Sequence, residues 1–276
     1  MNTNKPIEIY DSAKRPHPAI EEFFALIKYR DVIFQLVRRD IITRYKRSVL
    51  GIAWTMLNPL GTMLVMTIVF SQIFNRGNEY PVYVLTGLTV WNFFSWSTRQ
   101  SMTSMISGAN LFDRIYLPRT TFVVAAVGTS VINLLFSMVP LLLIMLIVRE
   151  PIPLTFLLFP IPVILLALFS LGIGLIISSY VIYFPDILEI YPILIMAWMY
   201  LSPVMIPLEV LQKILNGWEI RLNPMSYLLS FFRDIVFYGK WPTADIVASA
   251  LILSFGVFVI GWLVFTKQSD RFTYDA

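Results

Sequence analysis

The stretch RRDIITRYKRSVLGIAWTMLNP, residues 38–59, changes character in its middle. Its first ten positions hold five Lys or Arg residues, and no further charge occurs until Arg76. Lys and Arg collect at the cytoplasmic ends of membrane spans, so a cationic segment directly before a long apolar run is typical of a membrane boundary. The stretch therefore predicts a helix at the membrane surface that leads into a first span.

The whole chain has the composition of an integral membrane protein. Of its 276 residues, 57% are hydrophobic and 14% are charged, which is too few charges for a soluble domain. The first 48 residues carry charges throughout and lack the apolar core of a cleavable signal peptide, so we expect the N-terminus to stay in the cytoplasm. The chain has no cysteine, which excludes disulfides and thiolate sites. His17 is expected to be a solvated surface residue, and neither a catalytic residue nor a metal site is predicted.

Charge-free stretches locate the spans, because a charge at the bilayer centre costs at least about 2.5 kcal/mol. These stretches are residues 48–75, 80–98, 120–148, 151–185, 190–208 and 246–266. A helix needs roughly 20 residues to cross a bilayer, so each stretch holds one span. We expect six spans, over about residues 49–75, 81–106, 120–148, 154–181, 188–207 and 245–266. The predicted fold is an all-α membrane protein with a transmembrane domain over 48–266 between tails at 1–25 and 267–276.

The distribution of cations predicts the orientation. Ten of the 21 Lys and Arg residues lie before the first span, which by the positive-inside rule places the N-terminus in the cytoplasm. An even number of spans then places the C-terminus there as well. Two features oppose this orientation mildly: the acidic turn at Asp186 and Glu189, and the cations within 209–245. The N-terminal cluster outweighs them, because it is larger and adjoins the first span.

The pattern of apolar and polar residues over 26–47 predicts an amphipathic helix at the membrane surface. At 100° per residue one face is apolar and the opposite face is polar. The apolar face holds Leu26, Tyr29, Ile33, Leu36, Val37 and Ile41, and the polar face holds Lys28, Asp31, Gln35, Arg38, Arg39 and Lys46. Asp40 and Arg44 fall inside the apolar stripe, where they either form an i, i+4 ion pair or remain solvated because the stripe rotates. Gly51 permits a tight bend into the first span, and Pro59 is expected to kink that span.

Two further segments differ from plain loops. GANLFDRIYLPRTTF, residues 108–122, mixes charges with apolar anchors and reads either as a short helix that docks on another protein or as a connecting loop. Residues 209–241 predict two short apolar helices, the second with Asn223 as N-cap, Pro224 at the first helical position and Gly239 past its end. Such a pair forms a re-entrant hairpin or lies on the outer surface.

Aromatic residues make up 15% of the chain, and most lie near span ends, where interfacial belts are expected. Some lie deeper in the spans, and aromatic faces with polar edges suit a sugar-conducting surface. Candidate pathway residues are Trp91, Trp96, Arg99, Trp198 and Tyr200. The tract SWSTRQSMTSMISG, residues 95–108, is polar enough that it should face protein or water.

These parts, in this order, resemble the membrane permeases of ABC-type polysaccharide exporters, the Wzm-like O-antigen and teichoic-acid group. The resemblance rests on RRDIITRYKRSVLGIAW with the following LNP, on DRIYLPR, on YFPDILEI between spans four and five, and on LNPMSY in the outer hairpin. It covers nearly the whole chain from about residue 28. One departure is Pro185, where a basic residue would be expected before Asp186, which puts the polar contacts of that turn in doubt.

The resemblance implies a homodimer in the cytoplasmic membrane of a prokaryote, with each subunit docked on a cytoplasmic ATPase, that exports a lipid-linked polysaccharide. The ATPase would bind ATP and Mg²⁺, and this chain would hold no cofactor. It implies a coupling helix that contacts the ATPase, comprising Leu111, Phe112, Asp113, Arg114, Ile115, Tyr116, Leu117 and Arg119. It also implies an interface helix that contacts lipid headgroups, comprising Arg38, Arg39, Asp40, Arg44, Tyr45, Lys46 and Arg47. Residues 209–241 would form the outer gate.

Other function classes are weaker. The chain has no GxxxxGK[ST] phosphate loop, so it cannot be the motor itself. A membrane-embedded glycosyl- or acyltransferase would have to rely on Asp186 and Glu189. A proton-driven carrier would need ionisable residues within its spans, and the charge-free stretches contain none. A permease for lipid or drug efflux shares the architecture and stays open. Membrane lipids are expected contacts, and nucleic acid is not.

Overall fold

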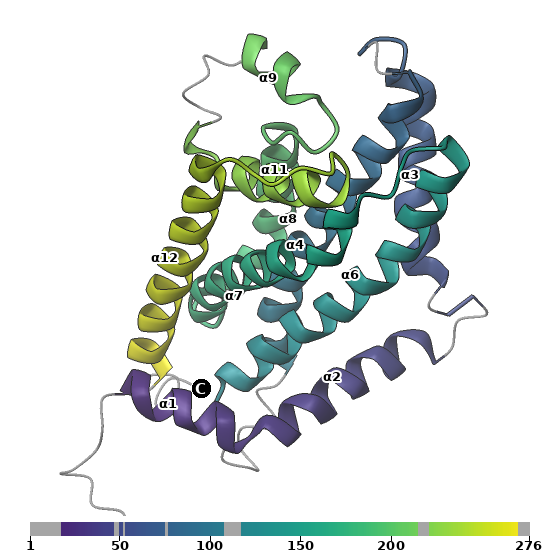
Figure 1. Ribbon diagram of the computed structural model, residues 1–276. Coiled ribbons are helices and arrows are strands. Elements are labelled where there is room, and N and C mark those ends of the chain that lie inside the picture. The colour runs from purple at the N-terminus through teal and green to yellow at the C-terminus, as the bar shows by residue number, and fades with distance from the viewer. Residues whose placement is uncertain are drawn as a thin grey trace, which may run out of the picture.

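The computed structural model describes residues 18–46, 50–51, 53–74, 77–107, 117–214 and 221–269. Within these ranges every regular element is a helix (Figure 1). The elements are α1 (Pro18–Lys28), α2 (Arg30–Tyr45), α3 (Ala53–Phe70), η2 (Gly77–Glu79), α4 (Tyr80–Ser107), α6 (Thr120–Val148), η3 (Leu154–Leu158), α7 (Pro160–Val181), α8 (Ile187–Tyr200), α9 (Leu208–Ile214), α11 (Pro224–Val236) and α12 (Ala244–Ser269).

Four segments of the described chain are long and apolar enough to cross a membrane: α3, α6, η3 together with α7, and α12. The helix α4 has 28 residues but contains Arg99 and the hydroxyl-rich tract. The helix α8 has 14 residues, and at 1.5 Å per residue it spans about 21 Å, which is short of a bilayer. The all-α membrane fold is confirmed, and the count of six spans stays a prediction.

The helix α4 is the centre of the molecule, because it contacts α3, α6, α7, α8 and α11. Its buried hydroxyls form hydrogen bonds within the helix: Thr89 Oγ1 donates to the Leu85 carbonyl at 2.8 Å, and Ser101 Oγ donates to the Ser97 carbonyl at 2.7 Å. Such bonds make a hydroxyl tolerable in an apolar interior. Ser97, Thr98 and Ser101 are buried, so the expectation that this part of the tract faces protein is confirmed.

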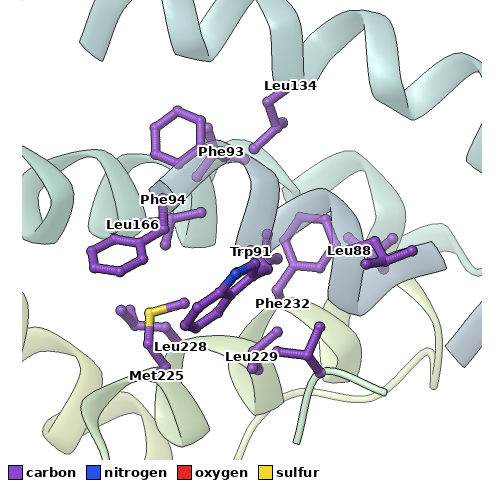
Figure 2. Close-up of a cluster of buried hydrophobic side chains, with 14 of the residues drawn as sticks. Leu88, Trp91, Phe93, Phe94, Leu134, Leu166, Met225, Leu228, Leu229 and Phe232 are labelled. Atoms are coloured by element: carbon purple, nitrogen blue, oxygen red, sulfur yellow. The ribbon is translucent and has the colours of Figure 1, made fainter. Parts of the chain in front are cut away.

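The main core forms where α4 meets α6, α7 and α11. Figure 2 shows Trp91 and Leu88 of α4 beside Phe232 of α11, with Leu166 of α7 and Leu134 of α6 at the edge of the same cluster. All five side chains are at most 3% exposed. Aromatic side chains bury the largest apolar areas, so they stabilise this junction most.

The expected single helix over 26–47 is two helices in the structure. Tyr29, with φ −97° and ψ 19°, separates α1 from α2. The two helices pack on different partners: α1 contacts α12, where Phe23 meets Trp262 edge to face, while α2 contacts α6 through Leu36 and Val37. Because one straight helix cannot follow both directions, the chain turns between them. Figure 1 shows α1 and α2 along one end of the bundle, with α1 close to the C-terminal end of α12.

The helices α7 and α12 cross without side chains between their backbones. A Cβ added to Gly172 of α7 would lie 2.5 Å from the carbonyl oxygen of Val257 in α12, and a Cβ added to Gly261 would meet the backbone of Gly172. Small residues at such a crossing let the backbones approach closely, which increases the van der Waals packing that holds helices together in lipid.

The expected hairpin lies in the half of the bundle away from α1 and α2 (Figure 1). Asn223 caps α11 by accepting a hydrogen bond from the Met225 amide at 3.0 Å, Pro224 occupies the first turn, and Gly239 has φ +66°. These three predicted features are confirmed. Most of α11 is buried against α4, α7, α12 and η3. Residues 215–220 lie outside the described part of the chain.

Candidate functional site

A polar cavity of about 500 Å³ lies between α2, α3, α4 and α6. Each of the last three helices contributes residues spaced about one turn apart, so a single face of each helix lines it. The lining residues are Arg44 from α2, Trp54, Thr55, Asn58 and Pro59 from α3, Thr89, Asn92, Phe93, Ser95 and Trp96 from α4, and Ser130, Asn133, Leu134 and Ser137 from α6. Sequence reasoning singled out two of these residues, Arg44 and Trp96, as site residues. The polar stripe Ser130, Asn133, Ser137 in an otherwise apolar span was the signal that could have found the rest.

Arg44 lies over the ring of Trp96, with the guanidinium carbon 3.8 Å from the ring centroid. This contact is a cation–π interaction of the kind that Arg forms with Trp. The predicted pair between Asp40 and Arg44 is not what the structure has: Asp40 Oδ1 pairs with the adjacent Arg39, whose Nη2 lies 2.8 Å away. The cause is the position of α4, which offers Arg44 an aromatic face that the sequence of α2 alone does not reveal.

The polar groups of the cavity fall into two kinds. The buried hydroxyls of Thr89 and Ser130 donate to carbonyls of their own helices, at 2.8 and 2.9 Å. The side chains of Asn58 and Asn92 are exposed, and among the described residues neither amide has a hydrogen-bond partner within the chain. Each amide therefore offers two donors and an acceptor to whatever enters the cavity.

The other described side chains of the predicted interface helix are not among the residues that line the cavity. Arg38, Arg39 and Lys46 are exposed, and Asp40 is half-buried. Arg38, Arg39 and Lys46 lie on the exposed face of α2, as the amphipathic pattern predicted, while Leu36 and Val37 on the opposite face are buried. The side chain of Tyr45 and the whole of Arg47 lie outside the described residues.

Most of the predicted coupling helix, residues 111–116, also lies outside the described residues. Leu117 and Arg119 at its end are half-buried. The next residue is the first of α6, and Glu22 of α1 holds it: Glu22 Oε1 accepts from the Thr120 hydroxyl at 2.8 Å and from the Thr120 amide at 3.5 Å. A carboxylate at a helix N-terminus is stabilised by the helix dipole. The predicted coupling segment is thus tied at its C-terminal end to α1.

The other predicted pathway residues lie elsewhere. Trp91 and Trp198 meet edge to face, with centroids 6.0 Å apart, and both pack against Phe94 inside the subunit. Figure 2 shows Trp91 within the apolar cluster. Tyr200 and Arg99 are exposed, and none of these residues lines the cavity beside Arg44. The positions of Trp91 and Trp198 are explained by their packing against other aromatic side chains within the subunit.

One residue that sequence reasoning passed over is Arg233 of α11. Its side chain is buried, donates to the carbonyls of Tyr83, Pro203 and Val204, and lies over the ring of Tyr83 at 3.6 Å. It thereby fastens the turn after α8 to the start of α4. A cation inside the apolar run SFFRDIVF was the available signal, because a charge placed there needs several acceptors.

The chain matches the family model described as ABC-2 type transporter over residues 31–237. It is 26% identical over 250 residues to the O-antigen export system permease protein RfbA of Myxococcus xanthus, covering 90% of this chain and 96% of the relative. It is 29% identical over 210 residues to the polysialic acid transport protein KpsM of Escherichia coli, covering 74% and 80%. It is 22% identical over 245 residues to the capsule polysaccharide export inner-membrane protein CtrC of Neisseria meningitidis serogroup B, covering 84% and 90%.

Proposed function

Since this chain belongs to the ABC-2 type transporter family, we propose that it is the permease half of an ABC transporter that exports a lipid-linked polysaccharide. The observation that carries the proposal is the extent of the similarity: relatives whose names specify O-antigen, polysialic acid or capsule polysaccharide export match this chain over 74% to 90% of its length. The family model itself covers residues 31–237, which run from α2 to the end of α11.

The polar cavity fits this function better than it fits a transporter of apolar molecules. Polar side chains inside a membrane are costly unless they bind one another, water or a polar substrate. A glycan presents hydroxyls that match the amides and hydroxyls of the cavity lining. O-antigen, capsule and teichoic acid polymers all share this hydroxyl-rich chemistry.

Energy for export would come from a separate cytoplasmic ATPase that binds ATP and Mg²⁺, because the chain has no phosphate loop of its own. We place α1, α2 and both termini on the cytoplasmic side of the inner membrane, where the cationic face of α2 would meet anionic lipid headgroups. The segment 111–119 would contact the ATPase through its apolar anchors. Two copies of the chain would enclose the pathway.

Deletion of the gene tests this function. We expect the surface polysaccharide to disappear while the completed lipid-linked polymer accumulates at the cytoplasmic face of the membrane, and we expect the wild-type gene to restore export. Fractionation followed by immunoblotting of the polymer measures both quantities. Unchanged surface polymer would contradict the proposal, and loss of polymer without internal accumulation would indicate a transferase instead.

A further inference from the structure

We propose that a second cavity, at the hairpin end of the bundle, binds a sugar residue of the exported polymer, with sugar hydroxyls on Asp234 and the sugar ring against Trp241. This cavity has a volume of about 490 Å³ and lies where the starts of α4 and α12 meet α11 and the turn after α8. It shares no lining residue with the cavity beside Arg44. The assignment rests on the proposed function, because it takes the ligand to be a glycan.

The second cavity lies near the membrane face opposite to α1. Trp241 and Thr243 line it just before α12 begins at Ala244, while Trp262 of the same helix packs on Phe23 of α1. The distance from Ala244 to Trp262 along the helix is about 27 Å at 1.5 Å per residue, which is close to the thickness of the hydrocarbon core. Figure 1 shows α9 and α11 toward one end of the bundle and α1 at the other. With α1 on the cytoplasmic side, a ligand of this cavity meets the protein on the outer side.

Asp234 gives the second cavity a buried acceptor. The residue is 6% exposed, and its carboxylate has one partner among the described residues, the Lys240 ammonium at 3.4 Å. The Lys240 side chain is 64% exposed, so side-chain entropy and water both weaken this pair. A buried carboxylate has about four acceptor positions and is destabilised when few of them are used. Adjacent sugar hydroxyls supply the donors that the carboxylate lacks.

Neighbouring side chains complete a surface that suits a sugar. Glu79, Ser230 and Thr243 line the same cavity, and their side chains have no hydrogen-bond partner among the described residues. Sugar hydroxyls can donate to the carboxylate and exchange hydrogen bonds with the two protein hydroxyls. Trp241 is 59% exposed, and its ring offers apolar surface to the C–H groups of a sugar. The lining therefore matches a ligand with hydroxyls at its edge and an apolar face.

The charge of the second cavity favours a neutral or amino-bearing sugar over an anionic one. Its described lining holds the carboxylates of Glu79, Glu209 and Asp234 and the cations of Arg233 and Lys240. The Arg233 guanidinium already donates to three carbonyls and to a hydroxyl of the protein. A phosphate or a sugar carboxylate would therefore meet an excess of negative charge, and like charges at an interface are unfavourable. The polymer unit that contacts this cavity is neutral or carries an amine.

Binding of glycan fragments to the purified complex of the permease with its ATPase tests the site, in nanodiscs that leave both membrane faces open to solution. The probes are short oligosaccharides made by partial acid hydrolysis of the host's own surface polysaccharide, and titration followed by saturation-transfer NMR measures Kd. We expect Asp234→Asn to weaken binding about tenfold, since hydrogen bonds to a charged group are lost. Trp241→Ala should weaken it about fivefold, and Trp241→Tyr, which keeps an aromatic face, should retain most of the affinity.

Two matched control variants change residues outside the second cavity. Asp245→Asn removes an exposed carboxylate close to Trp241 in the chain, and Phe184→Ala removes an exposed aromatic ring between α7 and α8. Both variants should bind the probe within about twofold of the wild type, as surface substitutions away from a site usually do. Melting temperatures of all variants check folding. Because Trp241 is exposed, its variants keep the test valid even if Asp234→Asn does not fold.

The preference for an uncharged sugar has a probe of its own. The same oligosaccharides with their primary hydroxyls oxidised to carboxylates should bind about tenfold more weakly than the parent probe. Glu79→Gln should narrow this difference, because it removes the excess negative charge. Tighter binding of the oxidised probe, or a polyanionic repeat unit in the host polysaccharide, would contradict the charge preference.

Three further results would overturn the site itself. Absence of saturable binding, or equal affinity in the wild type, Asp234→Asn and Trp241→Ala, would remove the glycan contact. Equal losses in Asp245→Asn and Phe184→Ala would show that the effect is not local to the cavity. Displacement of the oligosaccharide by an equal concentration of glycerophosphoethanolamine would assign the cavity to a lipid headgroup. Loss of export with internal accumulation on gene deletion would leave the proposed function standing in each case, so the two failures are distinguishable.

Discussion

The guanidinium of Arg233 donates to four acceptors in the protein interior: the carbonyls of Tyr83, Pro203 and Val204 and the hydroxyl of Thr86. The side chain is 3% exposed. A buried cation is stable only when hydrogen bonds replace its lost hydration. Arg233 therefore determines how the turn after α8 sits on α4, and it does so through a planar fork of donors that no other side chain provides.

We expect Arg233→Lys to lower the free energy of unfolding by about 2 kcal/mol or more, because an ammonium group cannot reach the same set of acceptors. The melting temperature of the detergent-solubilised protein measures this loss. Arg221→Lys is the control, since Arg221 is exposed near the same hairpin. If both variants have the same melting temperature as the wild type, the hydrogen bonds of Arg233 do not stabilise the fold.

Several residue roles could be predicted from local chemistry alone. Asn223 and Pro224 act at the start of α11 as the sequence indicated, and Gly51 has the positive φ of 48° expected for a tight bend. These roles depend on neighbours within a few positions. The partners of Arg44 and Arg233 could not be predicted in this way, because Trp96 and Val204 reach them only after separate helices have packed.

At the scale of elements, the contact between α7 and α12 depends on two glycines rather than on interlocking side chains. Gly172 and Gly261 bring the two backbones together, and a side chain at either position would meet backbone atoms of the other helix. Backbone atoms cannot swing aside as a flexible side chain can, so the helices themselves would have to separate.

Replacing Gly172 by Ala should therefore destabilise the protein by about 1 to 3 kcal/mol, the usual cost of overpacking. The comparison is Gly256→Ala on α12, where a Cβ would meet nothing within 4 Å. That variant should match or exceed the stability of the wild type, because Ala favours a helix over Gly by about 0.5–1 kcal/mol. Thermal unfolding of both variants measures the difference, and equal losses would contradict the close crossing.

The positions of the long helices could be predicted from the sequence, but some of the helix boundaries could not. Charge-free runs placed the long apolar helices, because the cost of burying charge in lipid acts on each segment independently. The break at Tyr29 was not predictable, since α1 and α2 are each compatible with one continuous helix until α12 and α6 offer them separate docking surfaces. The short α8 likewise ends at Tyr200, before the expected limit at 207, because the turn that follows packs on Arg233.

At the scale of the whole molecule, α4 links the cavity beside Arg44 to the hairpin: Thr89 lines the cavity, and Thr86, about one turn earlier, accepts a hydrogen bond from Arg233. The helices α3 and α8 expose apolar side chains, such as Ile68 at 71% and Ile193 at 64%. Such faces meet either lipid or a second copy of the chain. One subunit offers too little perimeter to surround a polymer, which is the physical reason to expect two.

The complex should contain two permease chains and two ATPase chains. Native mass spectrometry of the complex released from nanodiscs measures this ratio, with the mass of the permease alone as the reference. A single permease chain for each pair of ATPase chains would contradict a pathway formed between two copies.

ATP-driven movement of the polymer itself tests the central claim most directly. The permease and its ATPase would be reconstituted into proteoliposomes that carry the host's lipid-linked polysaccharide, with the ATPase facing outward, and the polymer exposed outside would be measured with a membrane-impermeant glycosidase. We predict that added ATP makes the polymer progressively resistant to the glycosidase, and that vesicles lacking the permease, or given a non-hydrolysable ATP analogue, show no protection. Polymer that stays fully accessible in the presence of ATP and both subunits would contradict the assignment of this chain as the export permease.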